Sequence, residues 1–241
     1  SHNTFPGLLI TDQSTAESAG EAYGLHLGWS GNHRISTELL GDGRGYVQMG
    51  ELLLSGEIIL AAGDSYLSPT LYAGYSNTGL NGLSQQFHQF YRSAISCPRT
   101  HNKPRPVHYN SWEAVYFDHQ PQQLLQLAEQ AAHVGAERFI LDDGWFKQRH
   151  NDSSGLGDWI VDKTVYPQGL DPLIAHIESL GMEFGLWIEP EMVNPNSDLF
   201  RKHPDWVLGA GANQPILARN QLVLNLSLPE VQSYLWGCIQ T

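Results

Sequence analysis

The sequence predicts a multidomain β plus α/β chain, in which the end of an N-terminal β-sandwich precedes the first part of a (β/α)8 TIM barrel. Two observations lead to this prediction. Short apolar stretches separated by Gly and Asn fill the first third of the chain, whereas strand-like and helix-like patterns alternate in the second half. With 241 residues and a hydrophobic share of 41%, the chain is large enough to bury a core.

Residues 1–80 are predicted to form the C-terminal part of the β-sandwich domain. Segments such as "YGLHLGWSGNH", "GYVQMGELLL" and "TLYAGYSNTG" combine short apolar runs with turn residues, as antiparallel strands do. Residues 81–104 are predicted to hold a connecting helix and a linker. Apolar residues recur there at near-helical intervals, at Leu83, Phe87, Phe90, Tyr91, Ala94 and Ile95. The proline-rich "CPRTHNKPRP" that follows favours neither helix nor strand, so we place the domain boundary there.

Residues 105–241 alternate between strand and helix patterns, which predicts about the first three βα units of a barrel. The predicted strands are "VHYNSW" (107–112), "RFILDD" and "EFGLWIE". The predicted helices are "PQQLLQLAEQAAHVG", with Pro121 at its start and Gly135 at its end, and "LDPLIAHIESLG", which has an apolar face and ends at Gly181. A complete barrel takes about 250 residues, so this segment is too short for eight units.

A doubly wound sheet is the alternative to a barrel. Two features favour the barrel. No glycine-rich phosphate loop follows the first predicted strand, as a nucleotide-binding sheet requires. Each predicted strand also ends in polar or aromatic residues, and barrels place their chemistry at the carboxyl ends of strands. These residues are Trp112 with Glu113, Asp142 with Asp143, and Glu189 with Glu191.

The composition limits the partners and the compartment. Lys and Arg number 13 against 25 Asp and Glu, which gives a formal charge of -12 and argues against nucleic acid or an anionic membrane. Two widely spaced cysteines, the lack of a long apolar run and the lack of a signal-peptide pattern lead us to expect a cytoplasmic protein. Because the first residue is not Met, we expect the chain to begin after processing or within a longer protein.

Asp142 and Asp143 are the foremost candidate site residues, because they follow a predicted strand and precede Gly144, which permits the backbone to turn. A catalytic carboxylate pair in a glycosidase flanks the scissile bond, with separations of about 5 to 5.5 Å for retention or about 6.5 to 9.5 Å for inversion. Adjacent residues would approach a ligand from one side only. They are better suited to accept hydrogen bonds from two neighbouring sugar hydroxyls. A turn Asp before Gly is the structural alternative.

Trp187, Glu189 and Glu191 in "GLWIEPEMVNP" would share one face of an extended strand. Trp187 offers an apolar surface to a sugar ring, as does Trp112, and each is otherwise a core residue. Glu189 is an acid/base candidate on its sequence context alone. A metal site built on these acids is conceivable, but no histidine lies at ligand spacing beside them, so no metal is predicted.

Arg219 lies among apolar residues in "ILARNQLVLNLS". A surface position is the ordinary case for such a residue. An inward position would provide a fixed cation that binds hydroxyls or neutralises carboxylates. The 11 histidines are scattered, and their spacing indicates no Ser-His-Asp or Cys-His arrangement.

Four segments, "RPVHYNSWEA", "RFILDDGWF", "GLWIEPEMVNPNSDLFRKHPDWVL" and "LVLNLSLPEV", together resemble the glycoside hydrolase family 36 α-galactosidases. Upstream, "GWSGNHR" and "GLNGLSQQFHQFYR" resemble that family's N-terminal β-sandwich and connecting helix. The resemblance covers most of the chain. It implies a retaining double displacement on terminal α-galactosides of the melibiose and raffinose type, no metal or organic cofactor, and a homo-oligomeric parent protein.

Five residues match positions that line the family's galactose subsite: Trp112, Asp142, Asp143, Trp187 and Arg219. The resemblance implies that the two Asp residues bind galactose hydroxyls. The family's nucleophile is the Asp of a Lys-x-Asp motif on the fourth barrel strand, and its acid/base is an Asp on a later strand. Neither motif occurs here, so no catalytic residue is predicted within this chain. Asn225 stands where relatives usually have Asp.

We therefore expect a fragment of an α-galactosidase that holds part of the sugar site and does not turn over an aryl α-galactoside by itself. A close alternative is an α-N-acetylgalactosaminidase or a galactosyl-transferring relative. An alternative of another class is a non-catalytic galactose-binding fragment.

Overall fold

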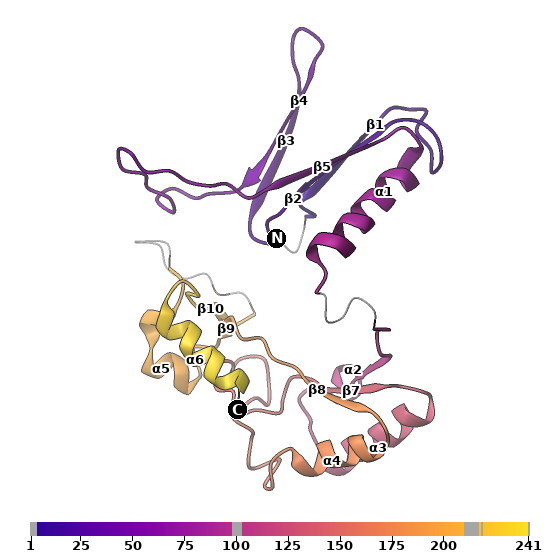
Figure 1. Ribbon diagram of the computed structural model, residues 1–241. Coiled ribbons are helices and arrows are strands. Elements are labelled where there is room, and N and C mark those ends of the chain that lie inside the picture. Colours follow the sequence, from indigo (N-terminus) through magenta and orange to yellow (C-terminus); the bar gives the residue numbers. More distant parts are fainter. Residues whose placement is uncertain (1–3, 98–102, 210–216, 218, 241) are drawn as a thin grey trace. The chain divides into compact units, whose positions relative to one another are not determined.

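The computed structural model describes residues 4–97, 103–209, 217 and 219–240 (Figure 1). The chain divides into two compact units, residues 1–103 and 104–241. Within the described ranges, no helix has the length and apolar character needed to cross a membrane.

The first unit is built from antiparallel strands, as its turn-rich sequence predicts. Its main sheet has the order β1-β2-β5, and a separate hairpin consists of β3 and β4. The bounds are Gly7–Thr11 for β1, Ala22–Leu27 for β2, His33–Leu39 for β3, Gly45–Glu51 for β4 and Leu71–Ser76 for β5.

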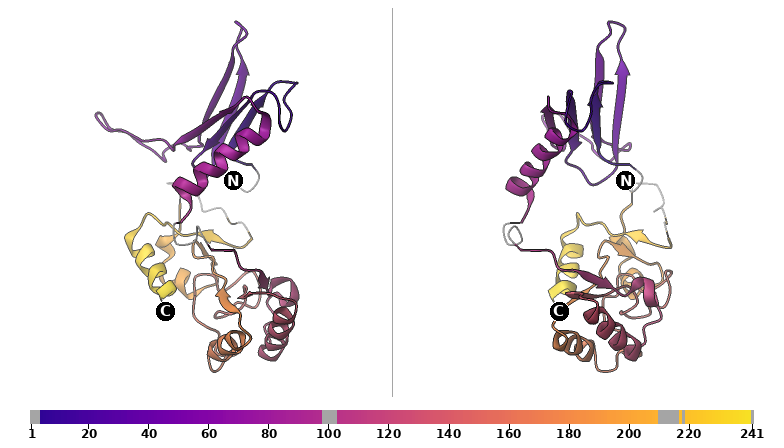
Figure 2. Two further views of the ribbon diagram at one scale, coloured as in Figure 1. Left: turned by 45° about the vertical axis from the view of Figure 1, so that its right-hand side comes forward. Right: turned by 90° about the vertical axis from the view of Figure 1, so that its right-hand side faces the viewer.

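Helix α1 (Gly79–Phe90) lies along one face of the three-stranded sheet (Figure 2). Gly24 and Gly74 on the sheet permit this close approach, because a Cβ at either position would come within 3.0 Å of the Leu83 side chain. The sequence predicted a helix over 83–95. The structure extends it to Gly79 and changes its last turn to a π-helix, η1 (Tyr91–Ile95), in which the Ser96 amide donates to the Tyr91 carbonyl five residues back.

The second unit contains a parallel sheet in the order β6-β7-β8, formed by His108–Asn110, Arg138–Leu141 and Glu183–Leu186. Helix α3 (Pro121–His133) connects the first two strands, and α4 (Asp171–Ser179) precedes the third. The two helices contact each other and lie side by side on the same side of the sheet (Figure 2). Consecutive strands with helices on one side indicate the start of a barrel, because a doubly wound sheet reverses its strand order.

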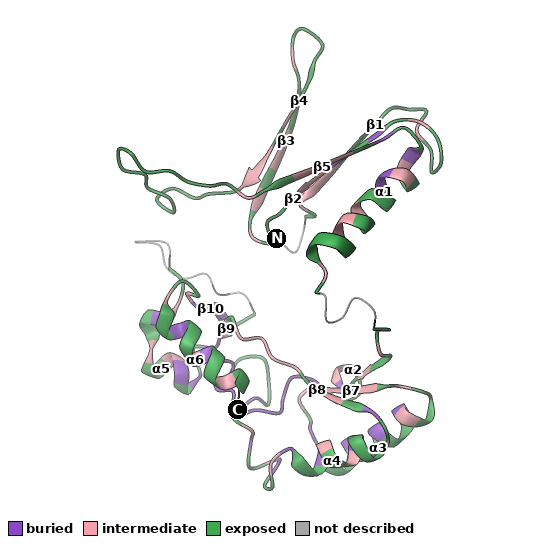
Figure 3. Ribbon diagram, viewed as in Figure 1, coloured by how far each residue is buried: buried purple, intermediate pink, exposed green. Residues whose placement is uncertain are grey.

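One part of the core of the second unit lies between these helices and the sheet, and the same cluster continues through the loop after β7 to the last helices of the chain (Figure 3). Leu124 and Ala128 of α3 and Phe139 of β7 are completely buried. As predicted, α3 begins at Pro121, whose missing amide hydrogen costs nothing at a helix start. It ends before Gly135, whose φ of 90° is accessible to glycine at little cost.

All three strands predicted for the second unit are shorter in the structure than in the prediction. The first, predicted over 107–112, ends at Asn110, because the Asn110 side-chain oxygen accepts a hydrogen bond from the Trp112 amide and turns the chain into α2 (Trp112–Val115). The second, predicted over 138–143, ends at Leu141. The third ends at Leu186. The segment that follows contains a turn closed by the Met192 amide and the Glu189 carbonyl, with Pro190 at the position where proline is favoured.

The remaining elements lie after β8. Strand β9 pairs with β10, which brings two segments that are distant in sequence side by side. The bounds are Met192–Val193 for β9, Asp198–Lys202 for α5, Pro204–Trp206 for the 3-10 helix η2, Leu222–Val223 for β10 and Pro229–Gln240 for α6.

Candidate functional site

The carboxyl ends of β6, β7 and β8 are joined by hydrogen bonds that continue the sheet beyond its strands. The Ser111 amide donates to the Ile140 carbonyl, and the Trp187 amide donates to the Leu141 carbonyl over 2.9 Å. The Asp142 amide in turn donates to the Ser111 hydroxyl oxygen over 3.0 Å. Residues that follow each strand are thereby held at one edge of the sheet.

Asp142 is fixed by its neighbours on both sides. The Asn110 side-chain amide donates to Asp142 Oδ2 over 2.5 Å, and the Asp143 amide donates to Asp142 Oδ1 over 2.7 Å. The residue remains 9% exposed. Because an ionised carboxylate has about four acceptor sites, Asp142 keeps acceptor capacity for a ligand hydroxyl.

Asp143 forms a buried, bidentate ion pair with Arg149. The Arg149 Nε donates to Asp143 Oδ1 over 2.8 Å, and Nη2 donates to Oδ2 over 2.7 Å. The Asp143 side chain is 8% exposed and that of Arg149 is 1% exposed. The adjacent acids therefore differ: one is bound by an amide and the other by a cation.

Sequence reasoning missed Arg149, although it is the largest fully buried side chain of the described residues. It lies in the loop between β7 and α4, outside any motif. The available signal was indirect, because two neighbouring acids after a buried strand need a compensating charge.

Trp187 belongs to an aromatic cluster. Its ring stacks against Phe146, with centroids 6.4 Å apart and planes inclined by 11°, and its carbonyl oxygen accepts from Trp145 Nε1 over 2.8 Å. Trp187 is half-buried, so part of its ring remains available. Trp112 is also half-buried and packs edge-on against Tyr116 and Phe117.

The single strand face predicted for Trp187, Glu189 and Glu191 is wrong, because β8 ends before all three. Glu189 nevertheless lies among the site's charges. Burial raises the pKa of Glu189, and Glu191 raises it further, while Arg219 and Arg149 oppose the rise.

Arg219 is exposed and, with Asn220, stands in a left-handed turn, with φ values of 53° and 58°. The Asn220 carbonyl accepts from the Asn194 side chain over 2.7 Å. Asn225 has a local role: its side-chain oxygen accepts from the amide and hydroxyl of Ser227 just before α6. An Asp there would make the same turn.

His119 lies on the buried side of the acidic turn, which is formed by Asp142, Asp143 and Gly144. Its Nδ1 lies 2.8 Å from the Tyr166 hydroxyl, and its ring lies against Gly144. Burial lowers the pKa of His119, and the nearby Asp143 opposes this. Across the described part of the chain, no cluster of three or more His, Cys, Asp or Glu side chains suits a metal ion.

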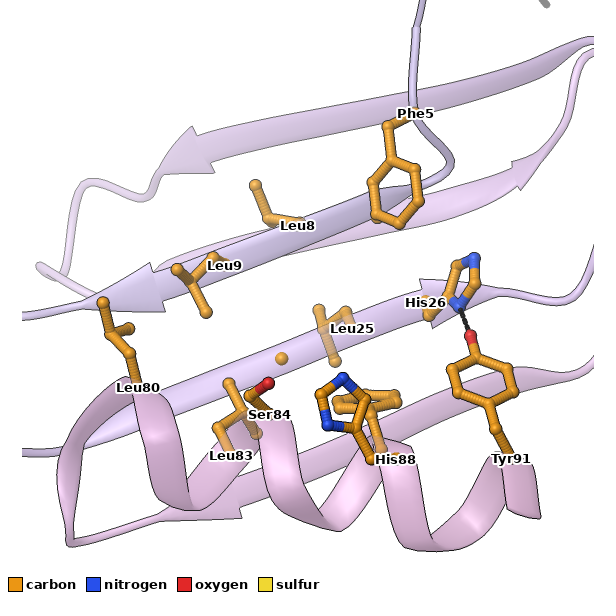
Figure 4. Close-up of a pocket in the computed structure, with 13 residues that line it drawn as sticks. Phe5, Leu8, Leu9, Leu25, His26, Leu80, Leu83, Ser84, His88 and Tyr91 are labelled. Carbon is orange, nitrogen blue, oxygen red and sulfur yellow. Dashed lines mark hydrogen bonds between the residues drawn. The ribbon is translucent and has the colours of Figure 1, made fainter. Parts of the chain in front are cut away.

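A second concave feature lies in the first unit, between α1 and the sheet (Figure 4). This cavity of about 510 Å³ is mostly apolar, and the Tyr91 hydroxyl is bonded to His26 Nδ1 at its rim. None of the five predicted site residues lines it.

The comparisons with known proteins agree with this arrangement. The family model described as Melibiase matches residues 65–241, and that described as glycosyl hydrolase family 36 N-terminal domain matches residues 1–61. The chain belongs to the melibiases of glycoside hydrolase family 36. The predicted family and fold class are confirmed; the predicted domain bounds and the five site residues stay predictions.

Among its relatives, the alpha-galactosidase of Escherichia coli is 52% identical over 237 residues, which are 98% of this chain and 33% of that protein. Alpha-galactosidase AgaA of Geobacillus stearothermophilus is 40% identical over 235 residues, covering 98% of this chain and 32% of that protein. A crystal structure of an AgaA variant in complex with raffinose superposes with a TM-score of 0.90 and 40% identity, over 97% of this chain and 33% of that one. The chain thus spans about a third of the length of these relatives.

Proposed function

We propose that the whole protein is a retaining α-galactosidase that hydrolyses terminal α-galactosyl residues of oligosaccharides of the melibiose and raffinose type. The observation that carries the proposal is the convergence of Asp142, Asp143 and Trp187 at the ends of adjacent barrel strands. Family membership supports it, as do the relatives named alpha-galactosidase and the raffinose complex of one of them.

In this proposal the chain supplies part of the galactose subsite. Asp142 and Asp143 accept hydrogen bonds from neighbouring hydroxyls, since each carboxylate retains free acceptor sites beside its protein partners. The half-buried rings of Trp112 and Trp187 offer apolar surface to the sugar. Arg219 provides a cation at the rim.

Bond cleavage requires a nucleophile and an acid/base on opposite sides of the glycosidic bond. The 241 residues contain no Lys-x-Asp sequence, so we assign no catalytic residue to them. Asp143 is unsuited to act as a nucleophile, because both of its oxygens bind the Arg149 guanidinium.

We also propose an oligosaccharide as the partner, no nucleic acid or membrane partner, a homo-oligomeric assembly and a cytoplasmic location. The formal charge of -12 supports the exclusion of polyanions. The two cysteines among 241 residues support a reducing compartment.

The test is to express the full coding sequence and to measure hydrolysis of p-nitrophenyl α-galactoside beside p-nitrophenyl α-N-acetylgalactosaminide. We expect hydrolysis of the first with retention of the anomeric configuration. In the 241-residue chain we expect binding of methyl α-galactoside without turnover. Preference for the acetylated substrate would contradict the galactoside assignment, and binding without hydrolysis by the whole protein would favour a sugar-binding role.

A further inference from the structure

The ion pair between Arg149 and Asp143 is part of a larger buried bridge. Besides its two bonds to Asp143, the guanidinium donates through Nη1 to the Ser154 carbonyl over 2.9 Å and to Asn194 Oδ1 over 3.1 Å. The guanidinium carbon also lies 5.2 Å from the centre of the Phe117 ring. A planar guanidinium that is hydrogen-bonded to three residues and packed on an aromatic ring has little freedom to rotate.

Asn194 continues the bridge from the other end. It is completely buried, and its Oδ1 accepts from the Leu156 amide as well as from Arg149. Its Nδ2 donates to the Asp152 carbonyl over 3.3 Å and to the Asn220 carbonyl over 2.7 Å. Each hydrogen and each acceptor site of this amide is therefore used, which fixes its orientation.

The bridge connects two segments that approach the site from different places in the chain. One end is the acidic turn after β7, and the other is the left-handed turn of Arg219 and Asn220 before β10. Stability alone does not call for this arrangement, because well-packed apolar residues commonly replace a buried ion pair at no cost in stability.

We propose that Arg149 and Asn194 are positioning residues that hold the Asp143 carboxylate at a fixed place relative to Arg219. Asp143 and Arg219 can then bind the same galactose. This inference rests on the proposed function for the sugar. Neither residue touches the sugar. Arg149 occupies one acceptor site on each Asp143 oxygen and thereby directs the remaining sites, and Asn194 holds the turn that carries Arg219.

The first arm of the test measures position without any sugar. Trypsin cleaves after arginine, so the rate of cleavage between Arg219 and Asn220 reports how firmly this turn is held. Asn194→Asp keeps the acceptor for Arg149 but loses both donor bonds. Of these two bonds, only the one to the Asn220 carbonyl holds this turn, so we expect cleavage there to be about tenfold faster, as for the loss of one buried hydrogen bond. The matched control is Arg138→Lys, because Arg138 pairs with Glu183 near the opposite ends of the strands, and we expect its cleavage rate at Arg219 to equal that of the wild type.

The second arm measures the affinity for methyl α-galactoside. Arg149→Lys keeps the charge but not the fork, and we expect an affinity about 100-fold lower, the scale of a misplacement near 1 Å. If Arg149 acts through Asp143, the losses for Arg149→Lys and Asp143→Asn combine to less than their sum in the double variant. Thermal unfolding shows whether each variant folds. If Arg149→Lys does not fold, Asn194→Asp carries the test.

The outcomes separate the inference from the proposed function. Galactoside binding by the wild type and equally by Arg149→Lys and Asn194→Asp would overturn the inference. Additive losses in the double variant, with unchanged trypsin cleavage, would also overturn it. Faster cleavage in Asn194→Asp with no galactoside binding by the wild type would support the positioning bridge and contradict the proposed function.

Discussion

Trp145 Nε1 donates a 2.8 Å hydrogen bond to the Trp187 carbonyl, and this bond ties the loop after β7 to the chain leaving β8. We expect Trp145→Phe to lower the free energy of unfolding by about 1 to 3 kcal/mol, since it removes the bond and part of a buried ring. Urea unfolding measures the change. The exposed Trp236 provides the control, because Trp236→Phe has no comparable burial to lose; equal effects of the two substitutions would contradict the prediction.

The two neighbouring acids differ in what their neutralisation costs. Asp143→Asn leaves the buried Arg149 without its counter-charge, and we expect a loss of about 3 to 5 kcal/mol in unfolding free energy. Asp142→Asn alters a contact with the neutral Asn110 amide, so its cost is smaller, about 1 kcal/mol. Denaturant titration of both variants at one pH tests the ranking, which the reverse order would refute.

Gly144 combines two constraints that glycine alone meets. Its φ is 116°, and a Cβ there would lie 3.1 Å from His119 Nε2. We expect Gly144→Ala to cost about 3 kcal/mol from backbone strain together with displacement of the ring. Gly135→Ala is the matched control, because Gly135 also has positive φ but has open space around it. Its expected cost is about 1 kcal/mol, and a similar cost for both would show that the His119 contact is unimportant.

The half-buried Glu189 makes stability depend on pH in a direction unusual for an acid. Its pKa in the folded state is raised above the ordinary 4.5, so the folded protein binds the proton more tightly than the unfolded chain. Stability from this group is present at low pH and is lost as the pH rises from 4.5 through the folded-state pKa. We expect Glu189→Gln to be more stable than the wild type at neutral pH and to lack this loss; parallel pH profiles of unfolding would argue against it.

His119 contributes the opposite slope. Burial lowers its pKa below the ordinary 6.5, so the unfolded chain takes up a proton more readily than the folded protein. Stability from this group is present above 6.5 and is lost as the pH falls through that value. We expect His119→Gln to reduce the acid sensitivity of unfolding as the pH falls below 6.5. An unchanged slope in that range would contradict the assignment, and His133→Gln, at an exposed position, is the control.

Much of the scaffold could be predicted from the sequence, because its signals are local. The apolar spacing of α3, its proline start and its glycine stop lie within one short segment, and the structure has the helix there. The short strands of the first unit were likewise recognisable from their turns. Domain bounds depend on where one hydrophobic core ends and the next begins. The spacing of apolar residues along the sequence does not define that point.

The site was predictable in part only. Asp142 and Asp143 could be found because a carboxylate pair after an apolar strand is conspicuous. The prediction that Trp187 and Glu189 share one face of a strand was wrong, because a turn around Pro190 replaces the extended chain. Arg149 and Asn194 were missed, because their roles depend on partners that lie near in space but, for Asn194, 45 residues away in sequence.

The loop between β7 and α4 buries its own aromatic and aliphatic side chains, among them Phe146, Leu156 and Trp159. Its conformation therefore depends on its own interior as well as on the sheet beneath it. In evolutionary terms, substitutions inside this loop must remain compatible with those in the helices and strands, because its buried side chains belong to the same hydrophobic cluster. A change of sugar preference within such a lineage would then require matched exchanges in the loop and in the residues that it packs against.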